Sequence, residues 1–198
     1  MSSAKRKNIL TFTEKGVAIL YFPKRGKDNT EQTLTLAVKT AKERGIGHIV
    51  VASNTGETAK KLLDCGINVV CITHAYGYRE KGENEMPEEM RAKLAEKGMR
   101  VYTSSHVLSG VERGVSNQAK GMYPAEIMSY TLRMFGQGVK VCVEISTMAL
   151  DAGLIPYGEE IVAIGGTQRG ADTAVILTPA HANEIFRTSI HEIVCKPV

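Results

Sequence analysis

Two kinds of hydrophobic pattern alternate along the chain. Short apolar runs predict buried strands, and longer segments whose apolar residues recur every three or four positions predict helices. Strands are expected at residues 9–13, 17–22, 48–52, 68–72, 99–103, 161–164, 173–177 and 189–195, the first of which could instead belong to an N-terminal arm. Helices are expected at residues 30–44, 57–65, 87–97, 124–135 and 139–152, with Pro87 and Pro124 as first helical residues.

This alternation predicts an α/β fold with three layers, α/β/α, in which helices cover both faces of a mostly parallel sheet. The link at residues 170–172 is far too short for a parallel crossover, so the strand at 173–177 should run antiparallel to the strand at 161–164. Residues 104–123 are rich in Gly and Ser and have no clear period, so a long loop is expected there. Gly136 and Gly138 are expected to separate the last two helices.

Composition limits the domain organisation and the function classes. A chain of 198 residues, 43% of them hydrophobic, can form one sizeable core. We expect an N-terminal arm at residues 1–16 and a single domain at residues 17–198. The net charge of +4 owes much to Lys5, Arg6 and Lys7, and the remainder is nearly balanced, so no nucleic-acid partner is indicated. No stretch reads as a membrane span or signal peptide.

Cysteine usage and known motifs narrow the function further. The four cysteines form no C-x-x-C pair, and three of them lie in apolar runs, which is typical of a reduced, cytoplasmic protein. The chain has no G-x-S-x-G nucleophile elbow, no Walker loop and no dinucleotide-binding G-x-G-x-x-G after a strand.

The turn after the strand at 48–52 is the best candidate for binding an anion. A strand that passes directly into a helix leaves several backbone N–H groups unpaired, and these groups and the helix dipole attract phosphate. Ser53, Thr55 and Thr58 add hydroxyl donors, while Gly56 leaves room for the ligand. An ordinary capped turn between strand and helix is the alternative interpretation, since Ser, Asn and Thr are common caps.

Four polar loops follow strand ends, where ligands bind in open α/β sheets. These loops are residues 53–58, 73–78, 104–110 and 165–172, and their convergence predicts a small-molecule site. In the last loop, Gly165, Gly166 and Gly170 could form a backbone nest for an anion or simply a hairpin turn.

Several other side chains have two readings. His74 and His106 could donate to a ligand or transfer a proton, or could cap loop carbonyls. With His181 they could bind a metal, although no tight ligand spacing supports this and we expect no metal. Glu144 lies in a polar stripe of its helix, which would be solvated or ion-paired.

Two motifs resemble the C-terminal domain of pyruvate kinase. Residues 53–59 match its Ser/Thr-x-Ser/Thr-Gly-x-Thr-Ala loop, which holds a sugar-phosphate effector there. Gly166 and residues 170–173 resemble its later glycine loop, with Asp172 in place of Asn. From about Val17 onwards the whole chain looks like a stand-alone prokaryotic family with this fold. The segments that carry the likeness are residues 50–53 with Gly56 and Thr58, residues 105–106 with 108–110, residues 140–145, and residues 165–166 with 170–174.

The resemblance implies a core strand order of 3-2-1-4-5 with the last core strand antiparallel, and flavin mononucleotide (FMN) as the ligand. The first and fourth core strands would then be neighbours, and the 53–58 and 165–172 loops would face one crevice. On this reading one set of residues holds the phosphate: Ser53, Asn54, Thr55, Gly56 and Thr58. A second set lines the rest of the flavin: Thr73, His74, Ser105, His106, Gly165, Gly166, Thr167, Gly170 and Asp172.

Three hypotheses about function remain open. The first is a cytoplasmic FMN-binding protein, which could be a flavin-dependent oxidoreductase of unknown substrate. The second is a non-catalytic regulatory or sensor module that binds a phosphorylated metabolite. The third is a metal-dependent hydrolase built on His74, His106 and His181. A homo-oligomer could form through the apolar helix at 139–152 or through the terminal strands.

Overall fold

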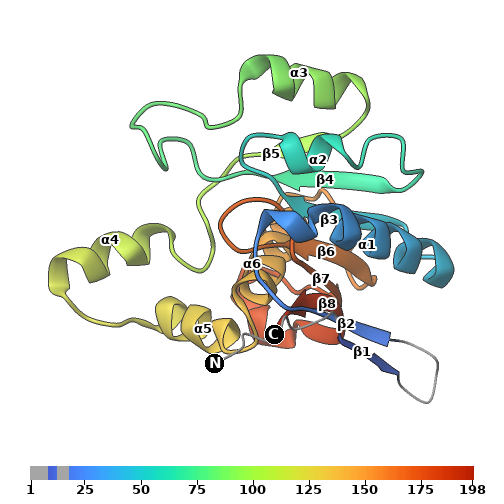
Figure 1. Ribbon diagram of the computed structural model, residues 1–198. Coiled ribbons are helices and arrows are strands. Elements are labelled where there is room, and N and C mark those ends of the chain that lie inside the picture. The colour runs from blue at the N-terminus through green and yellow to red at the C-terminus, as the bar shows by residue number, and fades with distance from the viewer. Residues whose placement is uncertain (1–8, 13–17) are drawn as a thin grey trace, which may run out of the picture.

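The computed structural model describes residues 9–12 and 18–198. Within these residues one sheet has the order β1-β2-β8-β7-β6-β3-β4-β5 (Figure 1). Its strands are β1 (Ile9–Phe12), β2 (Ala18–Phe22), β3 (His48–Ala52), β4 (Asn68–Ile72), β5 (Arg100–Tyr102), β6 (Ile161–Gly165), β7 (Thr173–Thr178) and β8 (Ser189–Pro197). The α-helices are α1 (Thr30–Arg44), α2 (Glu57–Lys60), α3 (Glu88–Glu96), α4 (Gly110–Ala119), α5 (Pro124–Arg133) and α6 (Gln137–Asp151).

The predicted core topology is confirmed. Strands β5, β4, β3, β6 and β7 lie side by side in that order, which is the order 3-2-1-4-5 of the core strands. The first four are parallel to their neighbours, and β7 pairs antiparallel with β6 from Gly165–Thr173 to Ile161–Leu177. Strand β8 pairs antiparallel with β7. Strand β2 pairs parallel with β8, and β1 pairs antiparallel with β2 and forms the edge of the sheet on that side.

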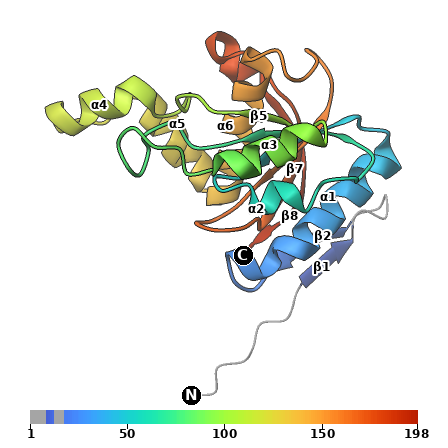
Figure 2. The ribbon, with the colours of Figure 1, turned by 90° about the horizontal axis from the view of Figure 1, so that it is seen from above.

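Helices cover both faces of this sheet, as the pattern predicted. Ile49 and Val51 of β3 pack into one hydrophobic cluster with α1, α2 and α3, whereas Val50 packs into a second cluster with α6. Neighbouring residues of a strand point to opposite faces, so an uninterrupted apolar run is required when both faces are covered. Figure 2 shows the two helical layers on either side of the sheet, with α4 extending away from both.

Two predicted elements are wrong in extent. The helix expected at 57–65 ends at Lys60, because the following amides bond three residues back, from Lys61 to Thr58 and from Leu62 to Ala59, and Asp64 adopts a left-handed φ of 60°. The long loop expected at 104–123 contains the ten-residue helix α4. In α4 only Ser116 is buried, so packing imposes no apolar period that a sequence could show.

Smaller differences concern the ends of elements. Pro87 is the N-cap of α3 and not its first helical residue. The C-terminal strand extends two residues further than predicted, to Pro197. Thr13 and Val17, which the strand predictions included, lie outside the described residues. Gly136 separates α5 from α6 as predicted, but Gly138 lies inside α6.

Glycine is required at position 138 because α6 approaches β7 closely there. A Cβ atom there would overlap the buried side chain of Thr173. We expect Gly138→Ala to lower the free energy of unfolding by about 1–3 kcal/mol, the usual effect of overpacking a core. Gly114→Ala in α4 is the matched control, since nothing lies within 4 Å of its added Cβ, and it should raise stability by about 0.5–1 kcal/mol. Urea unfolding of both variants tests this, and equal effects would contradict it.

Candidate functional site

Three of the four predicted loops meet at the carboxyl edge of the sheet. The side-chain amide of Asn54, after β3, lies 3.0 Å from Nε2 of His74, after β4. The ring of His74 lies 5.5 Å from the ring of His106, after β5. The fourth loop, residues 165–172, follows β6, whose residue Ile164 is in register with Val51 of β3. The loops after β3 and β6 therefore leave the sheet side by side.

The loop after β3 presents a run of free backbone donors. Among the described residues, no acceptor is found for the amides of residues 54–58, and the next amide, that of Ala59, is capped by Oγ of Ser53 at 3.3 Å. Gly56 lies in the middle of this run with a left-handed φ of 87°. Successive amides around a left-handed residue form a concave nest that binds anions. Thr55 is exposed beside it, whereas Ser53 and Thr58 are buried.

Gly56 has a different reason to be glycine from the one the sequence suggested. A Cβ atom at this position would overlap the side chain of Met90 and contact Leu94, so α3 packs directly against the loop. The helix that follows, α2, has only four residues and contributes a small dipole. Any anion binding at this loop would therefore rest on its individual amides and hydroxyl groups.

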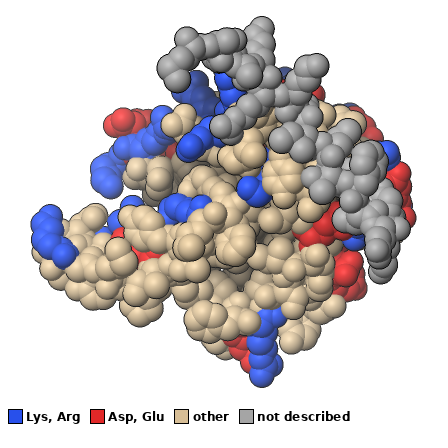
Figure 3. Space-filling view, turned by 60° about the horizontal axis from the view of Figure 1, so that its bottom comes forward, with Lys and Arg blue, Asp and Glu red and all other residues tan. Residues whose placement is uncertain are grey.

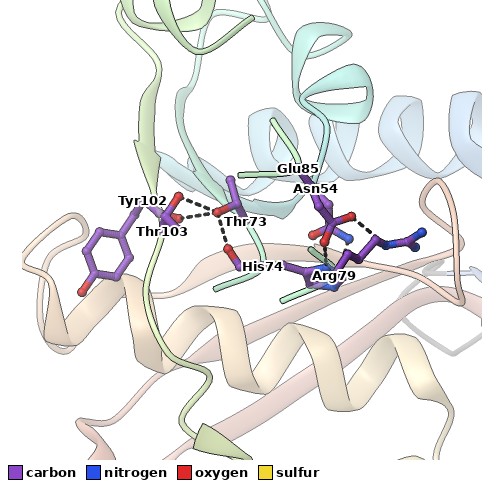
Figure 4. A network of polar contacts seen from close by, with 7 residues as sticks. All are labelled: Asn54, Thr73, His74, Arg79, Glu85, Tyr102 and Thr103. Atoms are coloured by element: carbon purple, nitrogen blue, oxygen red, sulfur yellow. Dashed lines mark hydrogen bonds and ion pairs between the residues drawn. The ribbon is translucent and has the colours of Figure 1, made fainter. Parts of the chain in front are cut away.

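His74 is held by two side chains and positions Asn54 (Figure 4). Its Nδ1 donates to a carboxylate oxygen of Glu85, because a carboxylate can only accept. Its Nε2 then accepts the hydrogen bond from Asn54. Arg79 pairs with the other oxygen of Glu85 at 2.9 Å. The result is a chain of contacts from Arg79 to Asn54 in which both nitrogens of His74 are occupied.

Thr73 connects loops within the protein and is not available on the surface of the site. Its side chain is buried, and its hydroxyl lies 2.6 Å from the hydroxyl of Thr103 and 2.8 Å from the carbonyl of His74 (Figure 4). Arg91 of α3 donates to the Thr103 hydroxyl at 3.0 Å. These bonds fasten the loops after β4 and β5 to each other and to α3.

Aromatic rings gather beside His74. The ring of Tyr78 lies 4.0 Å from the ring of His74 and 5.8 Å from that of His106. Tyr78 is exposed, so its ring is accessible for stacking, and Tyr76 is exposed two residues earlier in the same loop. Ser105, next to His106 in the chain, is exposed as well.

A buried ion pair lies next to His106. Lys140 and Glu144, one turn apart in α6, are paired and almost completely buried. Glu144 also accepts a hydrogen bond from the backbone amide of Leu108 at 3.1 Å, which fixes the loop that carries His106. Of the two alternatives predicted for Glu144, the ion pair is confirmed. The pair is buried, so Glu144 is not on a solvated face.

The surroundings of His106 lower its pKa. Burial is the largest cause, and His74 and Lys140 act in the same direction, while Glu144 and a hydrogen bond to the backbone of Thr73 oppose them. Because the folded protein then binds fewer protons than the unfolded chain, stability should fall as the pH decreases below the usual pKa of about 6.5.

We expect His106→Gln to weaken this pH dependence. Urea unfolding at about pH 7.5 and about pH 5.5 measures it, with the wild-type protein losing more stability than the variant between the two values. His191→Gln is a suitable control because His191 is a half-exposed histidine on β8, far from this loop in the sheet order. A pKa of His106 above 6.5 by NMR would contradict the prediction.

The glycine loop after β6 is closed by Asp172. This buried carboxylate accepts hydrogen bonds from the amides of Gly26 at 2.8 Å and Thr167 at 3.2 Å, and from the Thr173 hydroxyl at 2.9 Å. Gly170 has a φ of 73° and packs against Thr30, where a Cβ atom would overlap the hydroxyl. The loop is thus tied to the connection between β2 and α1.

Gly165 and Gly166 are also required by close packing. A Cβ atom on Gly165 would lie 2.7 Å from the carbonyl oxygen of Gly138, and one on Gly166 would overlap the carbonyl of Gly170. Both glycines therefore bring backbone segments together at this edge. Thr167 is half-buried beside them.

Comparison with known proteins identifies the family of this chain. The family model of the pyruvate kinase alpha/beta domain matches residues 31–177, from α1 to β7. The chain belongs to this family. The match includes all four loops of the candidate site. Strands β1, β2 and β8 lie outside it, so they flank the pyruvate kinase alpha/beta domain on one side of the sheet.

Solved structures of pyruvate kinase from Cryptosporidium parvum are similar to this domain. Two of them share 16% and 15% identity with TM-scores of 0.41 and 0.38, and they cover 75% and 74% of this chain. A third, of the kinase in complex with ADP, shares 16% identity with a TM-score of 0.38 and covers 74%. The chain spans only 21–22% of the length of these kinases.

The structure also reveals residues of the site in this pyruvate kinase alpha/beta domain that sequence reasoning missed. Glu85 orients His74 and Arg79 pairs with Glu85, and no spacing rule links either residue to His74. The loop after β2 was not considered, although Gly26 bonds to Asp172. His181, in contrast, lies away from the other two histidines and pairs with Asp151 at the opposite end of α6.

The cysteines contribute no reactive group to the site. All four are unpaired. Burial raises the pKa of Cys71 and of Cys195 to about 12, and it raises the pKa of Cys142 well above its ordinary value. Thiols with such pKa values are not nucleophilic near neutral pH. Among the described residues, no helix is long and apolar enough to cross a bilayer.

Proposed function

We propose that this protein binds FMN, with its phosphate on the loop after β3. The observation that supports this best is the run of amides at residues 54–58, which have no acceptor among the described residues and surround the left-handed Gly56. A dianionic phosphate ester accepts several such donors at once. The exposed hydroxyl of Thr55 adds a further donor.

The flavin ring would extend from this loop towards the ring cluster. Asn54 connects the two regions, because its amide donates to His74, whose ring packs against Tyr78. Exposed tyrosines favour stacking against a planar heterocycle. When bound, FMN would supply redox chemistry, and the chain would hold and orient it. His106 lies beside this cluster with its pKa lowered towards the neutral form, and it would face the ring as a hydrogen-bonding group.

A flavin-dependent oxidoreductase in the cytoplasm is the activity we propose for this site. The four unpaired cysteines support a reducing compartment. A regulatory or sensor module that binds a phosphorylated metabolite is the alternative. Both ring nitrogens of His74 are engaged in hydrogen bonds within the protein, so this side chain is not free to transfer a proton. This observation favours the sensor module.

Titration of purified protein with FMN tests the proposal. Binding should quench flavin fluorescence and raise the melting temperature, and riboflavin, which lacks the phosphate, should bind much more weakly. Inorganic phosphate should compete with FMN. If adding FMN leaves the melting temperature unchanged and its fluorescence is not quenched, the proposal that the protein binds FMN is wrong. Flavin-loaded protein that stays oxidised under excess NADH and NADPH would favour the sensor reading.

A further inference from the structure

Exposed apolar side chains concentrate on one part of the molecule. Helices α4 and α5 with their connection, here called the α4–α5 projection (residues 110–135), extend away from the sheet in Figures 1 and 2. Val111 and Met134 are 86% and 83% exposed. Seven large apolar side chains of the projection are exposed in total: Val111, Val115, Met122, Ile127, Tyr130, Met134 and Phe135.

Apolar residues lie on both faces of α5, because Met128 and Leu132 are half-buried while a second apolar stripe is exposed. Ile127, Tyr130 and Met134 recur at helical spacing and face outward from α5, whereas its buried residue is Ser129. In α4 the exposed residues Val111 and Val115 are one turn apart, and the buried residue is a serine as well. A surface helix normally turns its apolar stripe inward, so this stripe is oriented to contact another molecule.

The charges of the projection are mostly satisfied internally. Glu126 pairs with Arg113 at 3.3 Å and accepts a hydrogen bond from the Ser116 hydroxyl at 3.0 Å. Arg133 donates to Ser129 at 2.6 Å and to Gln137 at 2.7 Å. Figure 3 shows the projection as a mainly uncharged surface at the left of the molecule. Lys or Arg atoms appear at its left tip in Figure 3, and the rest of this surface offers little charge to a strongly charged partner.

We propose that the α4–α5 projection is the interface through which two copies of this chain associate. These seven residues are 47–86% exposed, so at on the order of 150–250 Å² for a large side chain they present up to roughly 800 Å², comparable to the roughly 800 Å² per partner that an interface of standard size buries. A mainly apolar surface is complementary to itself, which a two-fold interface requires. Two projections would form a four-helix arrangement with the apolar stripes inside.

This interface would be coupled to the candidate site through the chain itself. Helix α4 begins at Gly110, directly after the loop that carries His106 and that Glu144 holds at Leu108. Of the two interfaces expected from the sequence, helix α6 is unavailable because Val139 and most of the helix are buried inside the monomer.

Sedimentation velocity on the full chain tests the proposal. The wild-type protein should be a dimer, and the double variant Tyr130→Glu/Met134→Glu should raise the dissociation constant at least about 100-fold. Phe186→Glu is the matched control, because Phe186 is 87% exposed on a segment outside the projection and its replacement should leave the dimer intact. Val111→Glu in α4 provides an independent second variant, and far-ultraviolet circular dichroism verifies that each variant is folded.

Other outcomes would overturn the proposal. A wild-type protein that stays monomeric well above micromolar concentration contradicts it. So does a dimer that survives the projection variants but dissociates with Phe186→Glu. A monomer that co-sediments with lipid vesicles through these side chains would assign the projection to a membrane surface instead. FMN binding is measured separately, so the result does not depend on the proposed function.

Discussion

Replacing Lys140 with methionine is expected to lower the free energy of unfolding by about 3–5 kcal/mol. The variant leaves the buried carboxylate of Glu144 without its cation, and the low exposure of both side chains prevents water from compensating. Burial lowers the pKa of Lys140, and the attraction of Glu144 opposes this shift. Urea unfolding monitored by circular dichroism measures the change.

Two controls separate this effect from a general loss of the lysine. Lys39→Met removes one partner of the Lys39–Glu43 pair, which has the same i,i+4 spacing but is exposed on α1, and should cost about 0.5 kcal/mol or less. The double variant Lys140→Met/Glu144→Leu removes both buried charges and should be more stable than Lys140→Met alone. If Lys140→Met and Lys39→Met had equal effects, the buried pair would not have the importance assigned to it.

Replacing Thr55 with glutamate is expected to weaken FMN binding at least about 100-fold, or about 2.7 kcal/mol. Thr55 is exposed beside the run of free amides, so a carboxylate there would repel the phosphate and occupy its donors. Because Thr55 is exposed, the melting temperature without ligand should change little. Fluorescence titration with FMN provides the measurement.

Thr55→Gln is the matched control, since it has nearly the same size as the glutamate variant but no charge. It should reduce the affinity for FMN far less. Riboflavin, which has no phosphate, should bind wild type and Thr55→Glu about equally. A Thr55→Glu variant that binds FMN as tightly as the wild-type protein would place the phosphate elsewhere, even if the protein is a flavoprotein.

Local sequence signals were sufficient for the core of the fold. The apolar runs of β3, β4 and β6 are uninterrupted because both faces of those strands are covered, and Gly45 ends α1 in a left-handed conformation. The antiparallel direction of β7 followed from the shortness of the link at residues 170–172 alone. Each of these features depends on residues close together in the sequence, so local sequence patterns are sufficient to predict it.

The details of the site were decided by contacts between distant segments. Glu85 positions His74, Asp172 receives the amide of Gly26, and Met90 occupies the space beside Gly56. No periodicity reports such pairs, because each depends on how the loops and helices pack after the sheet has formed.

Helix α4 and its exposed apolar stripe are a further example of features that local sequence patterns do not predict. The sequence by itself determined the layers, the direction of the strands and the polar character of the loops at the carboxyl edge, since these follow from hydrophobic period and turn chemistry. Only the tertiary structure decided that Lys140 and Glu144 are buried together, that His74 is occupied on both nitrogens, and that the apolar stripe of α5 faces outward. Burial and orientation belong to the assembled chain, and a pattern along one segment cannot specify which of its faces the rest of the molecule covers.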